Sequence, residues 1–178
     1  MISPTTEDIL NAPIDGILTS LSIENWDILI VGDGSGNRHD SPCGWSSILI
    51  ERNTQNRRVF GGNANAGSIT FAEAMPYVQA LQWYDQLRGQ DILKTTSHML
   101  VHIVTDSQVV AITGNDARDL GKRPARTRLY LTSYLQELAR ARYKLHWHWA
   151  RRESSELNKL CDALSRRHRL SDPSYEKK

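Results

Sequence analysis

Long runs of apolar residues, separated by short polar turns, mark the first third of the chain and predict β-strands. Residues 27–33 are nearly all apolar and end at an aspartate, a pattern typical of a strand buried on both faces. Two more strands are predicted at 43–51 and 57–62, after turns rich in Gly, Ser, Asn and Thr. Connections this short favour antiparallel pairing of the three strands.

The spacing of apolar residues becomes helical from Ser68 and stays so until Gly89. Pro76 lies inside this pattern and has no N–H to donate to Ala72. We therefore expect this helix to start late or to kink at the proline.

Strands and helices alternate over the rest of the chain. Residues 99–106 form another apolar strand and 144–150 a fifth. Helices are expected at 107–112, at 129–138 and from Ser154 or Ser155 onward. This order predicts an α/β fold, with a five-stranded mixed sheet (three antiparallel strands and then two parallel ones) flanked by helices.

A length of 178 residues is typical of a single domain, which we place at 26–170. Residues 1–25, where Thr5 or Thr6 is positioned to cap a short helix, are expected to be a packed N-terminal extension. Residues 171–178 are expected to be a disordered tail. The chain starts without the basic and apolar regions of a signal peptide, and no apolar run approaches the roughly 18 residues of a membrane span, so no membrane partner is expected.

Charge is distributed unevenly, although the net charge is only +2. Residues 1–110 carry 6 Lys or Arg against 12 Asp or Glu, whereas 111–178 carry 16 against 8. This asymmetry indicates either a polyanionic partner for the C-terminal half or a set of solvated helix faces. Cys43 and Cys161 are predicted to be free thiols in a reducing compartment, which favours a cytoplasmic protein.

Four carboxylates lie beside or within apolar segments, where unpaired charges are costly. Asp33 and Asp106 end two predicted strands, and Glu73 and Asp162 lie in two predicted helices. They are either helix caps and turn residues or ligands of a shared cation. Carboxylates are the ligands that Mg²⁺ prefers. Two such ions about 3.5–4 Å apart can activate a water and stabilise the leaving oxygen in phosphodiester hydrolysis.

The motifs around these carboxylates resemble those of the type 1 ribonuclease H family. The resemblance extends over about 27–168 and rests on four segments in order: Asp33-Gly34-Ser35-Gly36, Ala72-Glu73-Ala74, Thr105-Asp106-Ser107-Gln108 and 158–166, which contains Asp162. Each motif alone is a weak signal, whereas all four in the right structural context are specific. The resemblance implies a monomeric, metal-dependent endonuclease that cuts the RNA strand of RNA–DNA hybrids to 3′-hydroxyl and 5′-phosphate ends.

The same resemblance implies roles for individual residues. Asp33 would bridge two Mg²⁺ ions, for which Mn²⁺ would substitute. Asp162 would help to hold the ion that activates water, and Glu73 and Asp106 would complete the ion on the leaving-group side. The predicted substrate contacts, which read RNA through its backbone and 2′-hydroxyls, are Gly34, Ser35, Gly36, Thr70, Ser107, Gln108, Arg123, Arg126, Arg152 and Asn158.

Two departures from the family pattern concern the substrate rather than the metal. Ile69 and Thr70 stand where asparagines are common, and only the threonine can donate a hydrogen bond. No histidine occurs in the stretch 151–156 before the last helix, where Arg152 or Glu156 would have to substitute. Five cations are expected to contact phosphates of the uncut strand in place of a basic protrusion: Arg118, Lys122, Arg123, Arg126 and Arg128.

Some residues invite other interpretations. His146 and His148 share a strand face, but edge-strand packing is favoured over a metal site because no third ligand is spaced to match. The tryptophans are expected in the core rather than as platforms for bases: Trp45, Trp83, Trp147 and Trp149. Two other functions remain open, a DNA-directed nuclease of the same fold, as in resolvases and transposases, and a non-catalytic nucleic-acid-binding module.

Overall fold

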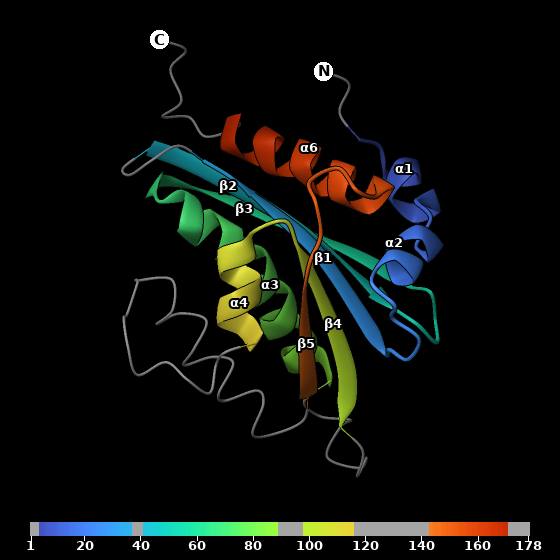
Figure 1. Ribbon diagram of the computed structural model, residues 1–178. Coiled ribbons are helices and arrows are strands. Elements are labelled where there is room, and N and C mark those ends of the chain that lie inside the picture. The colour runs from blue at the N-terminus through green and yellow to red at the C-terminus, as the bar shows by residue number, and fades with distance from the viewer. Residues whose placement is uncertain (1–3, 37–40, 89–97, 116–142, 171–178) are drawn as a thin grey trace.

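The computed structural model describes residues 4–36, 41–88, 98–115 and 143–170. Five strands of these residues form one sheet in the order β3-β2-β1-β4-β5 (Figure 1). Strands β1, β2 and β3 pair antiparallel, whereas β4 pairs parallel with β1 and with β5, so the predicted fold class is confirmed. The strands are β1 Ile28–Ser35, β2 Ser41–Glu51, β3 Arg57–Gly67, β4 Met99–Thr105 and β5 Tyr143–Trp149.

Strand β3 is five residues longer than the sequence pattern indicates. Its pairing with β2 continues past the expected end at Gly62 to the partners Cys43–Ala64 and Ser41–Gly67, with a register shift between these two pairs. The five extra residues are small or polar. They lack the large apolar side chains from which a strand is predicted, so the predicted strand ends before the observed one.

Helices cover both faces of the sheet (Figure 1). One face carries α3, Ile69–Arg88, and α4, Gln108–Asn115; the other carries α1, Thr6–Asn11, α2, Asp15–Ser20, and α6, Glu156–Leu170. Of the two predicted starts of α6, Ser154 and Ser155, it is Ser155 that caps the helix, because its Oγ accepts from the Asn158 N–H at 3.2 Å. The predicted helix 129–138 and the predicted tail 171–178 lie outside the described residues.

Pro76 lies in the middle of α3, so the predicted late start of this helix is wrong. The helix begins at Ile69 because the Ser68 side chain accepts from the Phe71 N–H at 3.1 Å and caps its first turn. The Pro76 carbonyl accepts from the Ser47 hydroxyl of β2 at 2.9 Å. Proline leaves the Ala72 carbonyl without its helical donor, and this carbonyl faces Gly34 of β1.

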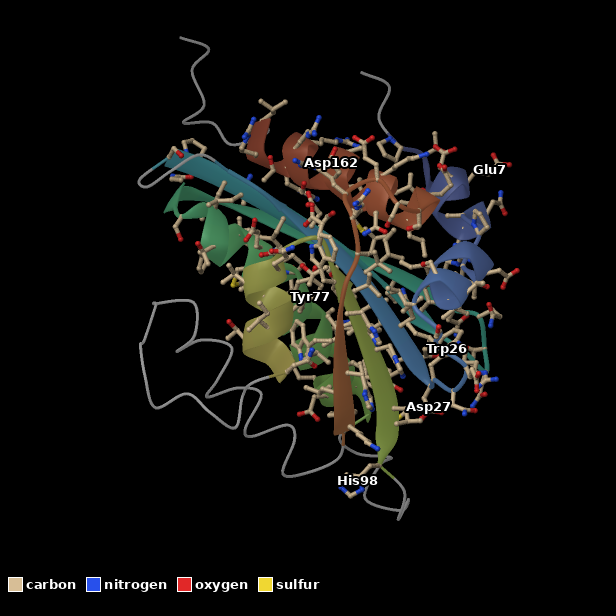
Figure 2. All side chains as sticks on the ribbon, viewed as in Figure 1. Glu7, Trp26, Asp27, Tyr77, His98 and Asp162 are labelled. Carbon is tan, nitrogen blue, oxygen red and sulfur yellow. The ribbon has the colours of Figure 1, made fainter. Side chains whose placement is uncertain are left out.

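Strand β1 is buried on both faces, as its apolar run predicts. Ile28 and Ile30 pack in the core under α3, whereas Leu29 and Val31 pack in the core under α6. Tyr77 of α3 lies near the middle of the molecule (Figure 2). Its hydroxyl is 2.7 Å from the Gly32 carbonyl and 3.2 Å from the Val104 carbonyl. One buried side chain therefore ties α3 to β1 and β4 just before both strands end.

The N-terminal segment packs onto the α6 face. Thr5 caps α1 with a reciprocal pair of hydrogen bonds to Asp8, as one of the two predicted caps. Ile9 and Ile17 are buried in the same core as Leu29 and Val31. Arg57 of β3 holds this segment at the end of α1, because its Nη1 donates to the carbonyls of Ile9 and Ala12, both at 2.7 Å.

Replacing Arg57 by Ala is expected to loosen this segment and to lower the free energy of unfolding by about 2 kcal/mol, because two charge-assisted hydrogen bonds are lost. Amide exchange should rise in α1 and α2 and stay unchanged in α3. The matched control is Arg58→Ala, which removes only a cation lying 5.7 Å over the exposed side of Trp83. Equal exchange in the two variants would contradict this role of Arg57.

Histidines from β4 and β5 gather on one face of the sheet. His102 stacks on His146 and on His148, with ring centroids 5.0 Å apart in both pairs, and its Nδ1 is 2.9 Å from the His148 Nε2. The sequence pattern gave no sign of this third ring, because His102 lies on another strand. The stacking of the rings supports packing for the two histidines of β5. As the side chains of the described residues stand, no three His, Cys, Asp or Glu are placed to hold one metal ion, the acidic residues that follow β4 and lie in β1 included.

Trp149 corrects one expectation about the tryptophans. Trp45 and Trp147 are buried, and Trp83 packs partly buried against the core. Trp149 is 42% exposed, and its indole N–H donates to the Asp106 carbonyl at 2.9 Å. The alternation of β5 puts it on the same side as Trp147, but at the last residue of the strand, beyond the core.

Cys43 and Cys161 are both buried, and neither forms a disulfide within the described residues, as expected for two thiols. Within the described ranges, no helix combines the length and the apolar character needed to cross a lipid bilayer.

Candidate active site

Asp33 and Asp106 come to the same level at one edge of the sheet. Strands β1 and β4 are parallel neighbours, and their register pairs Gly32 with Thr105. The next residue of each chain segment is the aspartate, so both carboxylates stand where the parallel pairing of β1 with β4 ends, although β1 itself continues along β2 to Ser35. Asp33 is 5% exposed and faces α6, and the Asp106 side chain is 19% exposed.

Glu73 reaches the same edge because α3 approaches β1 at glycine. A Cβ on Gly34 would lie 2.4 Å from the Ala72 carbonyl carbon and from the Glu73 nitrogen, distances that real side chains do not adopt. The absence of a side chain at Gly34 thus sets how close the first turn of α3 lies to the strand end. Ser107, directly after Asp106, donates its hydroxyl hydrogen to Glu73 Oε2 at 2.7 Å and fixes that carboxylate.

Asp162 approaches from the opposite face, on α6 (Figure 2). Ser165, one turn later on the same helix, is fully buried, and its hydroxyl donates to Asp33 Oδ2 at 2.6 Å. Gly44 of β2 makes this approach possible, because a Cβ there would lie 2.3 Å from the backbone nitrogen of Arg169 and 2.5 Å from the carbonyl oxygen of Ser165.

These elements enclose a polar pocket of about 410 Å³. Its acidic lining is formed by Asp33, Glu73 and Asp106, and residues 34–36, the first two of which still belong to β1, line it together with Ile69. Its basic side is formed by three arginines: Arg152, Arg166 and Arg169.

Burial makes the carboxylates poor acids. It raises the pKa of Asp33 to about 7, with a further increase from the charges of Asp106 and Asp162, although the Ser165 hydroxyl acts in the opposite direction. Burial also raises the pKa of Glu73 and of Asp106. A cluster that resists ionisation in this way is one that a bound cation would stabilise.

Arg152 supplies a positive charge to the cluster. Its Nε donates to Asp162 Oδ1 at 3.1 Å, its Nη2 makes a second, shorter contact to the same oxygen, and Asp106 Oδ2 is 3.9 Å from its Nε. Its charge acts against the effect of burial, because a nearby cation lowers the pKa of each of Asp33, Glu73 and Asp106, although burial has the larger effect. Arg166 holds the other oxygen of Asp162 through its Nη2 at 2.9 Å.

Comparisons with known proteins agree with this geometry. A curated protein named Ribonuclease H from Chelativorans sp. (strain BNC1) is 29% identical over 140 residues, which are 78% of this chain and 83% of that protein. The structure of the N-terminal RNase H domain of a Mycobacterium tuberculosis protein matches 82% of this chain and 94% of that one, at 16% identity and a TM-score of 0.61. That of LC11-RNase H1 in complex with an RNA/DNA hybrid matches 79% and 94%, at 16% identity and a TM-score of 0.59.

The chain has a ribonuclease H-like fold. The resemblance seen in its sequence motifs is confirmed, and so is the prediction that it is an enzyme of this kind. No protein-family model matches the chain.

The ribonuclease H-like pocket contains some of the predicted substrate contacts. Gly34, Ser35, Gly36 and Arg152 line it, but Thr70, Gln108 and Asn158 do not. Asn158 is buried at the start of α6, where its Oδ1 accepts from Ser155 Oγ at 2.6 Å. Ser107 donates its hydroxyl hydrogen to Glu73 and lies directly before α4, where its Oγ accepts from the Val110 N–H. The five cations at 118–128, Arg123 and Arg126 among them, lie outside the described residues.

Three residues of this ribonuclease H-like site escaped the sequence reasoning. Ser165, Arg166 and Arg169 follow Asp162 by three, four and seven residues, so helical periodicity places all of them on its face of α6. That spacing was the available signal, and it needed only the premise that Asp162 faces the site.

The donor set of the pocket fits a hard divalent cation. Three carboxylates line the pocket and that of Asp162 lies beside them, held by Arg152 and Arg166 of the lining, whereas neither a histidine nor a cysteine lines it. As the side chains stand, Ser107 holds Glu73 and two arginines hold Asp162, so a cation would have to exchange these contacts for its own. Asp33, Glu73, Asp106 and Asp162 are the residues that would hold it.

Replacing Arg152 by Gln tests this exchange. The melting temperature in EDTA should fall by about 3 °C, on the order of 1 kcal/mol, because half-exposed Arg152 no longer offsets the carboxylate charges. The rise in melting temperature on adding Mn²⁺ should be larger than in the wild type, because nothing competes for Asp162 Oδ1. Arg151→Gln, at an exposed neighbour, is the control. Identical melting curves for the two variants in EDTA would contradict the role given to Arg152.

Proposed function

We propose that this chain is a metal-dependent endonuclease that hydrolyses the RNA strand of RNA–DNA hybrids and leaves 3′-hydroxyl and 5′-phosphate ends. The observation that carries the proposal is the meeting of Asp33, Glu73 and Asp106 in one pocket, with Asp162 beside them on α6. Support also comes from the curated relative named Ribonuclease H and from LC11-RNase H1, whose structure contains an RNA/DNA hybrid.

In this proposal the four carboxylates hold two Mg²⁺ ions, or Mn²⁺ in their place. Bound divalent cations supply an activated water and a stabilised leaving oxygen for in-line displacement. Asp33 accepts at Oδ2 from Ser165 of α6, and the next residue along β1, Gly34, lies against α3. Asp162 contributes to the water-activating side, and Glu73 and Asp106 to the leaving-group side.

Recognition of the RNA strand is assigned to residues 34–36, which line the pocket at the end of β1. Their side chains are small, and their amides can approach 2′-hydroxyls, which distinguish RNA from DNA. Ile69 lines the pocket beside these residues and offers the substrate only apolar contact. We therefore expect weaker discrimination of hybrids from other duplexes than in relatives with an asparagine at this position.

The experiment is a cleavage assay with labelled RNA–DNA hybrid, duplex DNA and duplex RNA, each with Mg²⁺, Mn²⁺ or EDTA. We expect cleavage of the RNA strand of the hybrid with either metal and none in EDTA. Asp15→Asn, at an exposed position on α2, should retain this activity, and Asp33→Asn, prepared in the same way, reports any contaminating nuclease.

Each other outcome of the assay identifies a different function. Preferential cleavage of duplex DNA would make the chain a DNA-directed nuclease. Binding of the hybrid without cleavage under any metal would make it a nucleic-acid-binding module. Either result would refute the proposed activity.

A further inference from the structure

Arg169 is a partly buried cation that the chemistry described so far does not use. Its Nε is buried and finds no hydrogen-bond partner among the described residues, although the side chain lines the pocket. An unsatisfied buried donor costs about 1–3 kcal/mol, and on a charged group the cost is higher. A favourable interaction with the C-terminal end of α6 does not explain it, because that interaction needs no burial.

The surroundings of Arg169 hold it in the pocket. Its main chain lies directly against Gly44 of β2, where even a single Cβ would come within 2.3 Å of the Arg169 nitrogen. The preceding residue is fixed as well, because Asn63 donates its amide to the His168 carbonyl at 3.1 Å. The last turn of α6 is therefore anchored to β2 and β3, and its arginine is aimed at the pocket by a rigid backbone.

Arg166 stands one turn earlier on the same face of α6. One of its nitrogens holds Asp162, and its side chain is 36% exposed. A guanidinium carries five N–H donors, so most of the donors of Arg166 remain available to a ligand. Two guanidinium groups beside each other match an anion with several acceptor oxygens, and a phosphate is the anion that arginine pairs recognise best.

The lining of the pocket thus combines opposite charges. Its carboxylates suit cations, and Arg166 and Arg169 suit an anion. Residues 34–36, which have little side-chain bulk, line the same pocket. A nucleic acid strand that places one phosphate at the carboxylates extends to a neighbouring phosphate within the reach of the pocket.

We propose that Arg166 and Arg169 form a phosphate subsite that binds a backbone phosphate next to the one that is cut. The subsite deepens the proposed function and rests on it, because it requires a nucleic acid strand in the pocket. The Arg169 Nε receives its missing acceptor from this phosphate. Contacts of this kind fix the register of the strand and read no sequence.

The test compares Arg169→Met with Arg167→Met, which removes the same charge from an exposed position two residues earlier. Binding of a short RNA–DNA hybrid is measured by fluorescence anisotropy in EDTA across a range of salt concentrations. The Arg169 variant should bind about tenfold more weakly. Its slope of log affinity against log salt should be shallower by about 1, as for the loss of one phosphate contact. The Arg167 variant should keep the slope of the wild type.

A second measurement locates the phosphate. In a set of hybrids, each has one phosphate replaced by a neutral methylphosphonate. The wild type should lose affinity at a position near the cut that makes no difference to the Arg169 variant, since the contact is already absent there. If no single position separates the two proteins, the subsite is wrong.

Thermal melting distinguishes a binding role from a structural one. Because methionine removes an unsatisfied donor and keeps an apolar stem, Arg169→Met should melt at the temperature of the wild type or above it. A clearly lower melting temperature with unchanged hybrid affinity would overturn the proposal. If hybrids are cleaved but the Arg169 variant binds them like the wild type, the subsite fails while the proposed function stands. If hybrids are bound with the expected Arg169 dependence but never cleaved, the subsite stands and the activity fails.

Discussion

Replacing Asp33 by Asn is expected to abolish activity and, at the same time, to make the metal-free protein more stable. The carboxylate of Asp33 is buried between Ser165 and the other acids of the pocket, and its pKa is raised to about 7. Above that pH, the folded chain has to hold an ionised group that water would solvate better. Asparagine has nearly the same shape, and its Oδ1 can still accept from Ser165. The gain should be roughly 2 kcal/mol, or about 6 °C in melting temperature.

The stabilisation should depend on pH in a defined direction. The unfolded chain ionises Asp33 near its ordinary value of 3.8, whereas the folded chain does so at about 7. Between these values the folded state binds more protons, so the contribution of Asp33 to stability decreases as the pH rises. The advantage of Asp33→Asn should therefore be absent near pH 4, grow towards pH 7 and be constant above it.

Calorimetry in EDTA at several pH values measures this difference, and hydrolysis of the hybrid measures the loss of activity, expected to be on the order of 10³-fold. Added Mg²⁺ should raise the melting temperature of the wild type and leave that of the variant nearly unchanged, since a cation stabilises only a state that it binds. Asp15→Asn should behave like the wild type throughout. A variant that is less stable than the wild type at pH 8 would contradict the account of the cluster.

Replacing Gly34 by Ala should damage fold and site together. The added Cβ would lie 2.4 Å from backbone atoms of Ala72 and Glu73, which cannot move away as a flexible side chain can. Either β1 or the first turn of α3 has to shift, at a cost of about 3 kcal/mol, typical of severe overpacking. Because Glu73 moves with that turn, activity should fall further than the loss of folded protein explains.

The matched control for Gly34 is Gly16→Ala on α2, where an added Cβ meets nothing within 4 Å. That substitution should be neutral or slightly stabilising, since alanine restricts the unfolded chain. Urea denaturation gives the stabilities, and the hydrolysis rate per folded molecule at low temperature gives the second effect. Equal stability of the two glycine variants would show that α3 does not depend on close contact with β1.

The strand ends carry the part of the site that a sequence can reveal. Asp33 and Asp106 are recognisable because each closes an apolar run, and a run of that kind is a buried strand wherever it occurs. Parallel neighbours then bring their ends together without further information. The family motifs add Glu73 and Asp162, whose helical setting is confirmed by α3 and α6.

The parts that escaped prediction depend on distances between elements. Arg152 was expected to contact the substrate, but its hydrogen bond to Asp162 follows from no periodicity of the sequence. The contact of Ser165 with Asp33 requires α6 to lie within side-chain reach of β1, and Gly44 on a third element sets that approach. Pro76 misled for a related reason, since the carbonyl that it deprives of a helical donor, that of Ala72, lies at the contact with Gly34 of β1, which the spacing of apolar residues does not show.

The register between β1 and β4 has a consequence for how such a chain can change in length. Gly32 and Thr105 are partners, and the aspartate that follows each belongs to the site. Side chains alternate between the faces of a strand, so deleting or inserting one residue within either strand would turn its aspartate towards the opposite helix layer. We therefore expect insertions and deletions to be tolerated between the elements and not within β1 or β4. A set of variants, each with one residue inserted or deleted, would then locate the site by the positions at which a change of length abolishes activity.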